Sequence, residues 1–262
     1  MPAWLPLLGL ALAFAVPFMA ATWIVAVRIR NAGIVDIAWS AAFGPIALLY
    51  ALAGDGWAPR RWLLAAMVIL WSTRLATYLW RRVMGHHPEE DTRYRELRRT
   101  WAPRADARFF WFFEAQGLAA VGLSLPFAIA AVNLAPDLAT LEWAGVALWA
   151  IGLAGESLAD AQLARFKADA ANRGRVCQVG LWRYSRHPNY FFEWLIWCGY
   201  GVFALGSPWG VLALACPAVM LYLLLRVTGI PALEAAALRS RGDAYRDYQR
   251  TTSAFVPWFR RS

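Results

Sequence analysis

Polar side chains crowd into the stretch 180–197, GLWRYSRHPNYFFEWLIW, just before and within an apolar run. Six of them can ionise or hydrogen-bond: Arg183, Tyr184, Arg186, His187, Asn189 and Glu193. Pro188 suits the first position of a helix because its φ is already fixed near the helical value. A helix that begins there places Asn189, Glu193 and Trp197 on one face. A carboxylate is costly in hydrocarbon, so Glu193 is expected to face the bundle interior or a ligand.

A second set of polar residues lies upstream, where Glu156, Asp160 and Lys167 follow one stripe of a predicted helix. Asp160 could accept hydrogen bonds from a ribose or an amide, while Lys167 and Arg165 could bind phosphate. The alternative is an interfacial ion pair that contributes little. We favour a ligand site, because the stripe leads directly into the stretch 180–197.

Two further charges lie within or beside apolar runs. Asp36 stands near the start of one run, where it is either a helix-start acid or a group that binds ligand or transfers a proton. Arg74 is followed by Tyr78 and Arg82 at helical spacing. Arg74 and Tyr78 could line a polar cavity in which Tyr78 donates a proton or holds a carbonyl oxygen. Alternatively, Arg74 pairs with Asp36 or Glu114 and serves folding only.

The composition is that of an integral membrane protein, with 60% hydrophobic and 16% charged residues among 262. A helical span needs about 20 mainly apolar residues. Seven candidate spans follow: 4–27, 34–53, 61–81, 109–133, 142–164, 190–206 and 209–227. We therefore predict one all-α membrane domain over 1–262, a bundle of about seven transmembrane helices. Residues 231–250 are predicted to form a cytoplasmic amphipathic C-terminal helix.

The distribution of basic residues indicates the orientation. With the N-terminus outside, Arg60 and Arg61 are the only bases in external connections, and Arg74 lies within a span. The net charge of +9 then belongs to a cytoplasmic face that meets anionic lipid or a phosphate-bearing cofactor. It requires no nucleic acid. The three cysteines are expected to be free thiols, and no ligand cluster for a metal is present.

Five motifs spread over the chain together resemble one family. They are Asp36-Ile-Ala-Trp39, Arg74 to Tyr78, Glu90-Asp91-Thr92-Arg93-Tyr94, residues 180–193 and residues 248–259. This combination resembles the bacterial DUF1295 membrane proteins, a branch of the steroid 5α-reductase superfamily. The Arg-His-Pro-Asn-Tyr core at 186–190 also resembles isoprenylcysteine carboxyl methyltransferases and phospholipid methyltransferases.

The resemblance implies a seven-helix bundle of the bacterial inner membrane that binds NADPH in its half from about 142 to 262. It implies reduction of a carbon–carbon double bond conjugated to a ketone in a steroid-like or other lipid substrate. The implied catalytic residues are Asp36, Arg74 and Tyr78. The implied cofactor-binding residues are Asp160, Lys167, Tyr184, Arg186, His187, Asn189, Tyr190, Glu193, Arg93, Tyr94 and Tyr248. Steroid-reducing relatives have a Gln-Glu pair in span two and a Tyr in helix three, where this chain has Asp36 and Trp71.

Two other functions stay open. One is transfer of a methyl group from S-adenosylmethionine to a lipid or prenylated acceptor, although such relatives usually carry paired glutamates after the last helix and this chain has only Glu234 there. The other is lipid binding without catalysis, which the intramembrane acids beside bases argue against. The glycine-rich fingerprint of soluble dinucleotide-binding domains does not occur, so side chains would have to hold the cofactor.

Overall fold

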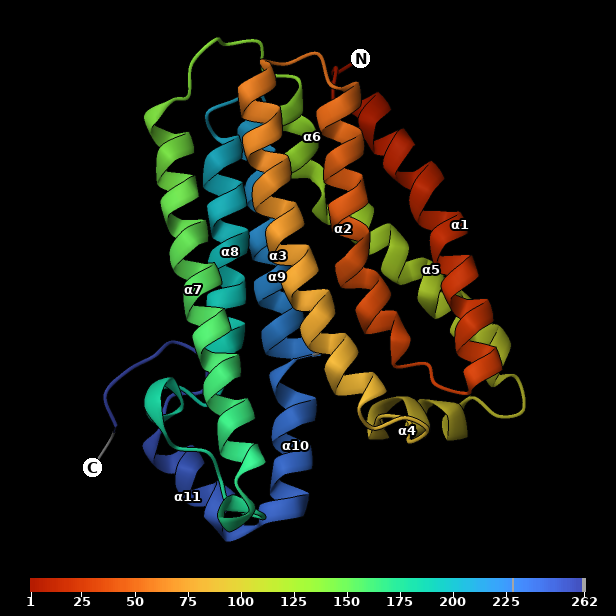
Figure 1. Ribbon diagram of the computed structural model, residues 1–262, viewed down its shortest axis with the longest axis vertical. Coiled ribbons are helices and arrows are strands. Elements are labelled where there is room, and N and C mark those ends of the chain that lie inside the picture. The colour runs from red at the N-terminus through yellow and green to blue at the C-terminus, as the bar shows by residue number, and fades with distance from the viewer. Residues whose placement is uncertain (228, 261–262) are drawn as a thin grey trace. The chain divides into compact units, whose positions relative to one another are not determined.

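The computed structural model describes residues 1–227 and 229–260, and every regular element in that part of the chain is helical (Figure 1). The chain forms two compact units. The N-terminal unit comprises Met1–Leu138 with Ser207–Gly210, and the C-terminal unit comprises Ala139–Gly206 with Val211–Ser262. The half predicted to bind a cofactor, 142–262, nearly coincides with the C-terminal unit.

The N-terminal unit consists of long apolar helices and one short polar helix. They are α1 (Leu5–Ile29), α2 (Ile34–Ala53), α3 (Ala58–Met84), α4 (Thr92–Thr100), α5 (Ala105–Leu123) and α6 (Leu125–Ala131). Pro126 stands at the start of α6, where a proline is tolerated. The predicted span 109–133 is therefore two consecutive helices. The hydrophilic connection 84–108 contains α4.

The C-terminal unit is built on two long antiparallel helices and a less regular third segment. Its elements are α7 (Thr140–Ala168), the 3₁₀ turns η1 (Ala170–Asn172) and η2 (Gly180–Arg183), α8 (Pro188–Ala204), η3 (Gly210–Leu214), α9 (Ala215–Tyr222), the π-helical turn η4 (Leu223–Val227), α10 (Ile230–Arg241) and α11 (Asp243–Thr251). The helix predicted to open at Pro188 does so, and this prediction is confirmed.

The single C-terminal helix predicted over 231–250 is wrong in one respect. The structure has two helices, α10 and α11, which are separated at Gly242. Gly242 has a φ of +52°, a conformation that glycine adopts at little cost and that ends a right-handed helix. Figure 1 shows α10 following α9 and α11 folded back beside the lower end of α7.

Five helical segments of the described chain are long and apolar enough to cross a membrane. They are α1, α2, α3, the combined α5 and α6, and the segment Gly210–Arg241. The other two predicted spans correspond to α7, which carries three acids along its length, and to α8, which has only 17 residues. An all-α membrane bundle is thus confirmed, and the count of seven spans stays a prediction.

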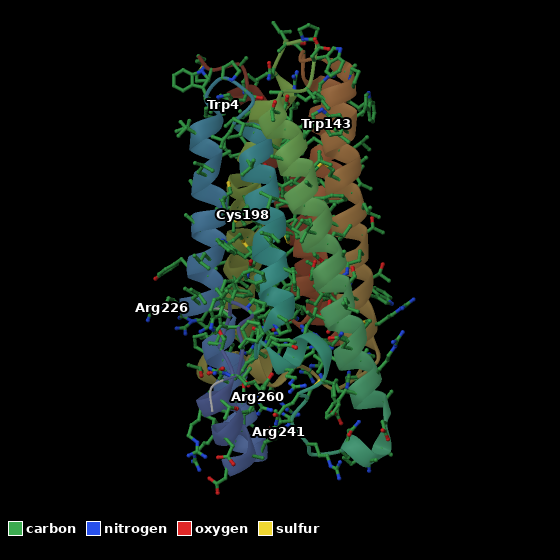
Figure 2. The ribbon with its side chains drawn as sticks, turned by 90° about the vertical axis from the view of Figure 1, so that its left-hand side faces the viewer. Trp4, Trp143, Cys198, Arg226, Arg241 and Arg260 are labelled. Carbon is green, nitrogen blue, oxygen red and sulfur yellow. The ribbon has the colours of Figure 1, made fainter. Side chains whose placement is uncertain are left out.

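Exposed tryptophans mark the depth of the bilayer along α3. Trp62 and Trp80 both expose about half of their surface. At 1.5 Å per residue they lie about 27 Å apart along the helix, close to the thickness of the hydrocarbon layer, about 30 Å. Tryptophan is enriched at the membrane interfaces. In the C-terminal unit, Figure 2 shows Trp143 at one end and Arg241 and Arg260 near the other.

The pair α7 and α8 packs backbone against backbone. A Cβ added at Gly145 would lie 2.5 Å from the amide nitrogen of Phe203, and one at Gly152 would lie 2.9 Å from the amide nitrogen of Ile196. Small residues allow this close approach. In lipid there is no hydrophobic driving force between helices, so the van der Waals contacts made at this distance stabilise the pair instead. The resulting antiparallel register also brings the C-terminal part of α7 beside the start of α8.

Replacement of Gly145 by alanine should destabilise the protein by about 1–3 kcal/mol, because the new methyl group meets backbone atoms that cannot move aside. Helix propensity alone would predict the opposite effect on stability, because alanine is favoured over glycine within a helix. Thermal unfolding of the detergent-purified protein measures it. Gly9→Ala is the matched control, since nothing lies within 4 Å of a Cβ there. Equal midpoints for the two variants would show that the close approach is unimportant.

Candidate functional site

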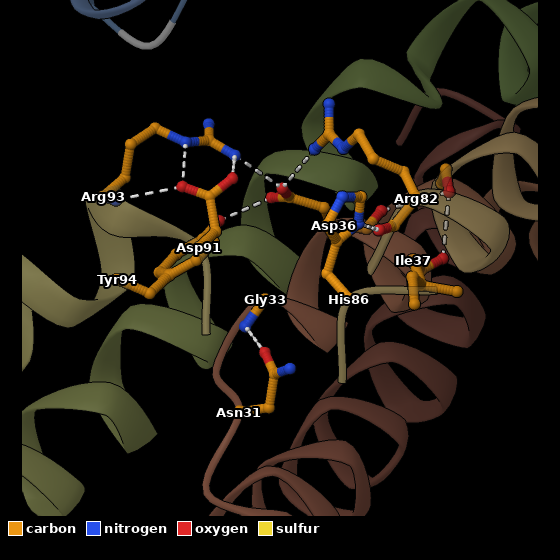
Figure 3. Close-up of polar contacts among 10 residues, drawn as sticks. Asn31, Gly33, Asp36, Ile37, Arg82, His86, Asp91, Arg93 and Tyr94 are labelled. Carbon is orange, nitrogen blue, oxygen red and sulfur yellow. Dashed lines mark hydrogen bonds and ion pairs between the residues drawn. The ribbon is translucent and has the colours of Figure 1, made fainter. Parts of the chain in front are cut away.

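In the N-terminal unit, three polar side chains from two helices converge on Asp36 of a third helix (Figure 3). Arg93 Nη2 lies 3.1 Å and Arg82 Nη2 lies 3.4 Å from Asp36 Oδ2. The hydroxyl of Tyr94 donates to Asp36 Oδ1 at 2.5 Å. Asp36 belongs to the first turn of α2, Arg82 to the end of α3, and Arg93 and Tyr94 to α4. The acid therefore ties α4 to the start of α2.

The start of α4 is fixed by its own acid. Asp91 Oδ1 accepts from the amide of Arg93 at 2.9 Å, which caps the helix. Arg93 Nη2 lies 3.2 Å from Asp91 Oδ2, so one guanidinium bridges Asp91 and Asp36. Burial opposes ionisation of Asp91, but the hydrogen bonds and charge of Arg93 hold its pKa below the ordinary value. Burial and the charge of Asp36 raise the pKa of Tyr94 well above its ordinary value, so the phenol keeps its proton.

A second carboxylate fastens the same segment to the turn between α1 and α2. Glu90 Oε1 accepts from the amide of Ala32 at 2.7 Å. Arg98 binds both oxygens of Glu90, at 2.8 and 3.0 Å, and also reaches Asp106 at 3.2 Å. Bidentate guanidinium–carboxylate contacts of this kind fix orientation as well as distance. The segment 84–108 is therefore docked on the α1–α2 turn.

These contacts limit the chemistry open to Asp36. Its two oxygens accept from two guanidinium groups and one phenol, so it has no proton to give unless the cluster opens. The single hydroxyl hydrogen of Tyr94 is already used. Catalysis by Asp36 stays a prediction, and the arrangement favours a positioning role for it.

The two other residues predicted to be catalytic, Arg74 and Tyr78, precede Arg82 on α3. The guanidinium carbon of Arg74 is 5.7 Å from the ring centre of Tyr78, which is a cation–π geometry. Asp36 pairs with Arg82 and Arg93. Arg74 makes further contacts of its own, and a folding pair between it and an acid stays a prediction.

In the C-terminal unit, the tail of the chain holds the segment that precedes α8. The amide of Arg186 donates to Ser253 O at 2.9 Å, and the amide of Trp258 donates to Tyr184 O at 2.9 Å. The hydroxyl of Ser185 donates to Phe255 O at 2.7 Å. These bonds clamp the segment along a short parallel pairing.

Tyr248 adds to this clamp from α11. Its hydroxyl contacts the carbonyl oxygens of Trp182 and Ser185, the latter at 3.1 Å. Burial raises the pKa of Tyr248, so the phenol remains a donor. Its predicted role in cofactor binding stays a prediction and would require these bonds to be exchanged.

Glu234 on α10 is a centre of contacts for the motif. Its Oε1 lies 2.6 Å from Arg186 Nε and 3.3 Å from His187 Nε2, and its Oε2 accepts from Gln249 at 2.8 Å. Arg186 Nη1 also donates to the carbonyls of Thr252 and Gln249, at 2.5 and 3.1 Å. The guanidinium is thus engaged within the protein. Sequence reasoning missed this role of Glu234, whose only signal was an acid one turn after Pro231.

The ends of α7 and α8 meet beside the clamped segment. Asn189 Nδ2 donates to Asp160 Oδ1 at 3.2 Å. The indole of Trp182 donates to Ala159 O at 2.9 Å and the amide of Leu181 to Gln162 Oε1 at 2.8 Å, so η2 is fixed against α7. This arrangement brings two of the predicted cofactor residues, Asp160 and Asn189, into direct contact.

The predicted cofactor residues of this unit differ in exposure. Asp160 and Glu193 are buried, whereas Lys167 and Tyr184 are exposed. The ring of Tyr190 stacks on that of His187 at 5.8 Å between centres. Several exposed arginines nearby in sequence make no ion pair among the described residues: Arg165, Arg173, Arg175 and Arg183. Buried acceptors therefore lie in the same unit as exposed, unpaired positive charge.

Comparisons with known proteins agree with the family that the sequence motifs resemble. The family model described as "Protein of unknown function (DUF1295)" matches residues 22–252. A protein of Schizosaccharomyces pombe described as "Uncharacterized protein C594.04c" is 28% identical over 206 residues, which cover 69% of this chain. The chain spans 60% of the length of that relative. No solved structure matches the chain.

Replacement of Asp36 by asparagine should loosen α4. The variant loses charge-assisted hydrogen bonds, which contribute about 1.5–3 kcal/mol each when buried. Their contribution here is smaller, because Arg82 and Arg93 are partly exposed and solvent screens the charges. Amide hydrogen exchange across Thr92–Thr100 should then rise by about tenfold or more. Asp106→Asn, which removes one exposed pair, should change exchange far less. An unaltered exchange pattern in the Asp36 variant would mean that another contact holds α4.

Replacement of Glu234 by glutamine should release the segment before α8. Arg186 and His187 lose their carboxylate partner, at a cost of about 2 kcal/mol for a partly buried charged pair. Amide exchange at residues 181–187 should increase, together with a lower unfolding temperature. Asp243→Asn on α11, an exposed position, provides the control. If both variants exchange like the parent, Glu234 is not what holds the motif.

Proposed function

The chain belongs to the DUF1295 family, as its motifs predicted, and on that premise we propose that it is a membrane enzyme that uses NADPH. The proposed reaction is reduction of a carbon–carbon double bond conjugated to a ketone in a steroid-like or other lipid substrate. The resemblance of the motifs to the steroid 5α-reductase superfamily supports this reaction. The proposed setting is a bacterial inner membrane, with the N-terminus outside and the basic segments in the cytoplasm.

The observation that carries the proposal is the contact between Asp160 and Asn189. The carboxylate lies about two turns before the end of α7, the amide lies in the first turn of α8, and they meet at 3.2 Å. Such groups are expensive to place in an apolar bundle and are retained where they serve a ligand. A carboxylate suits ribose hydroxyls, and an amide suits a carboxamide or a hydroxyl.

The donor set fits a molecule that combines phosphates with hydrogen-bonding rings. Lys167 and Tyr184 are exposed, and the unpaired Arg173, Arg175 and Arg183 belong to the segment that joins α7 to α8. Arginine and lysine are the usual phosphate-binding residues. We assign Asp160, Asn189 and Glu193 to the polar rings, and Lys167 with the arginines to the phosphates.

NADPH supplies the hydride, and the protein residues supply binding, orientation and charge. The engaged state of Asp36 favours Tyr78 as the group that donates a hydrogen bond or a proton to the ketone oxygen. The positive charge of Arg74 beside it would stabilise negative charge that develops on that oxygen. Under this assignment Asp36, Arg93 and Tyr94 keep α4 in place, and they do not transfer protons.

Methyl transfer from S-adenosylmethionine is the alternative function, and one contact in the structure supports it. Glu234, the acid that follows the last span, directly binds Arg186 and His187 of the motif shared with methyltransferases. An acid beyond the predicted span 209–227 thus contacts that motif. A titration with NADPH and S-adenosylmethionine separates the two functions. If neither of these ligands binds, the result favours a lipid-binding protein without catalysis.

The test is titration of the detergent-purified protein with NADPH, NADH and S-adenosylmethionine by calorimetry and thermal shift. We expect NADPH to bind and to raise the unfolding temperature, because a ligand that binds only the folded state stabilises it. Asn189→Ala and Glu193→Ala should each weaken NADPH binding about tenfold, whereas Tyr78→Phe should leave binding intact and slow turnover. Asp243→Asn is the neutral control.

Stabilisation by S-adenosylmethionine and not by NADPH would refute the reductase. Unchanged NADPH affinity in both the Asn189 and Glu193 variants would remove this face of α8 from the site while leaving the reaction itself open.

A further inference from the structure

A groove of about 450 Å³ runs between α2 and α3 of the N-terminal unit. Its volume is within the range of small-molecule sites. Uncharged residues line it throughout, among them Ala41, Gly44, Pro45, Ser72, Thr73 and Thr77. No residue of the proposed reductase site lines it, so the groove is separate from that site.

The groove lies at hydrocarbon depth. Thr73 stands between the two exposed tryptophans that mark the interfaces on α3, about 16 Å from Trp62 and about 10 Å from Trp80 along the axis. Water does not satisfy polar groups at this depth, so each hydroxyl and carbonyl needs a partner in the protein or a ligand.

Two of the three hydroxyl groups in the groove have partners. Ser72 Oγ donates to Ser40 O at 2.6 Å and accepts from the amide of Gly44 at 3.2 Å. Thr77 Oγ1 donates to Thr73 O at 2.7 Å. Thr73 Oγ1 takes part in no hydrogen bond with the described residues. Thr73 therefore presents an open hydroxyl to the groove.

A backbone acceptor is open on the other wall. Pro45 stands inside α2 and has no amide hydrogen, so the carbonyl of Ala41, four residues earlier, lacks its α-helical donor. A helix carbonyl points along the axis toward residue i+4. Because Ala41 and Pro45 both line the groove, this carbonyl lies on the groove side of α2. The two walls thus offer one hydroxyl and one acceptor in an otherwise apolar space.

We propose that this groove binds a lipid alcohol dissolved in the membrane. An alcohol oxygen can accept from Thr73 Oγ1 and donate its own hydrogen to the carbonyl of Ala41, while the hydrocarbon part fills the apolar walls. An ether or a ketone can only accept, and an alkane chain can do neither. The alcohol is the class that completes both hydrogen bonds.

The experiment uses the full-length protein in lipid nanodiscs and a long-chain alcohol that carries a photoreactive diazirine on its chain. Irradiation and mass spectrometry locate the label. We expect labelled peptides from α2 and α3, and we expect 1-hexadecanol to compete while hexadecane does not. Equal competition by hexadecane would overturn the proposal, because the groove would then hold any hydrocarbon chain.

The variants separate the hydroxyl from the shape of the groove. Thr73→Val keeps the shape and should reduce labelling about threefold to tenfold, the effect of one hydrogen bond. Thr77→Val is the matched control and should label like the parent, since its hydroxyl is used within α3. Thr73→Ser restores a hydroxyl and should restore labelling. Labelling of Thr73→Val at the parent level would overturn the proposal.

The carbonyl is tested through the proline. In the parent, hexadecanol should compete better than its methyl ether, which cannot donate. In Pro45→Ala the new amide satisfies Ala41, so the alcohol should lose its advantage over the ether. A preference for the alcohol that is unchanged in Pro45→Ala would show that the Ala41 carbonyl is not the acceptor and would overturn the assigned pair of bonds.

Discussion

A polar group within or beside an apolar bundle must find its partner inside the protein, and this constraint shapes both units. In the N-terminal unit, Asp36 at the start of α2 accepts from Arg93 on the connecting helix α4. In the C-terminal unit, Glu234 accepts from Arg186 on the segment before α8. In each case a carboxylate and an arginine that are far apart in sequence meet near the end of a span. The connecting segments are therefore ordered parts of the fold.

The C-terminal unit adds a second constraint, which is the distance between backbones. Gly145 and Gly152 let α7 and α8 approach so closely that any side chain at those positions would meet backbone atoms. Close contact of this kind permits one register, and a shift would produce clashes at both glycines. The same register places Asp160 opposite Asn189 two turns further on. Residues with no polar function thus determine which polar residues meet.

Sequence patterns predicted the features that depend on local chemistry. The apolar runs located the five helical segments that could cross a membrane, and Pro188 located the start of α8. The break at Gly242 had a local signal, a glycine between charged residues, but the amphipathic pattern continues across it. Partners distant in sequence could not be predicted from one chain. Glu234 looked like an ordinary surface acid of an amphipathic helix, and the charges of 84–108 fit a solvated loop as well as they fit a docked helix.

Helix α3 carries polar groups on two adjacent faces at hydrocarbon depth, and the two faces suit different oxygen functions. The hydroxyl of Tyr78 can donate to an acceptor such as a ketone, and Arg74, which has no acceptor atom, can donate to it or place positive charge beside it. The groove formed by Thr73 and Ala41 offers one donor and one acceptor, which suits an alcohol. Reduction of a conjugated double bond leaves the ketone oxygen an acceptor. A substrate with a ketone alone therefore cannot complete both bonds in the groove, and its product cannot either. A molecule that occupies the groove must carry a separate hydroxyl, so the lipid bound there is either a distinct compound or a substrate with two oxygen functions.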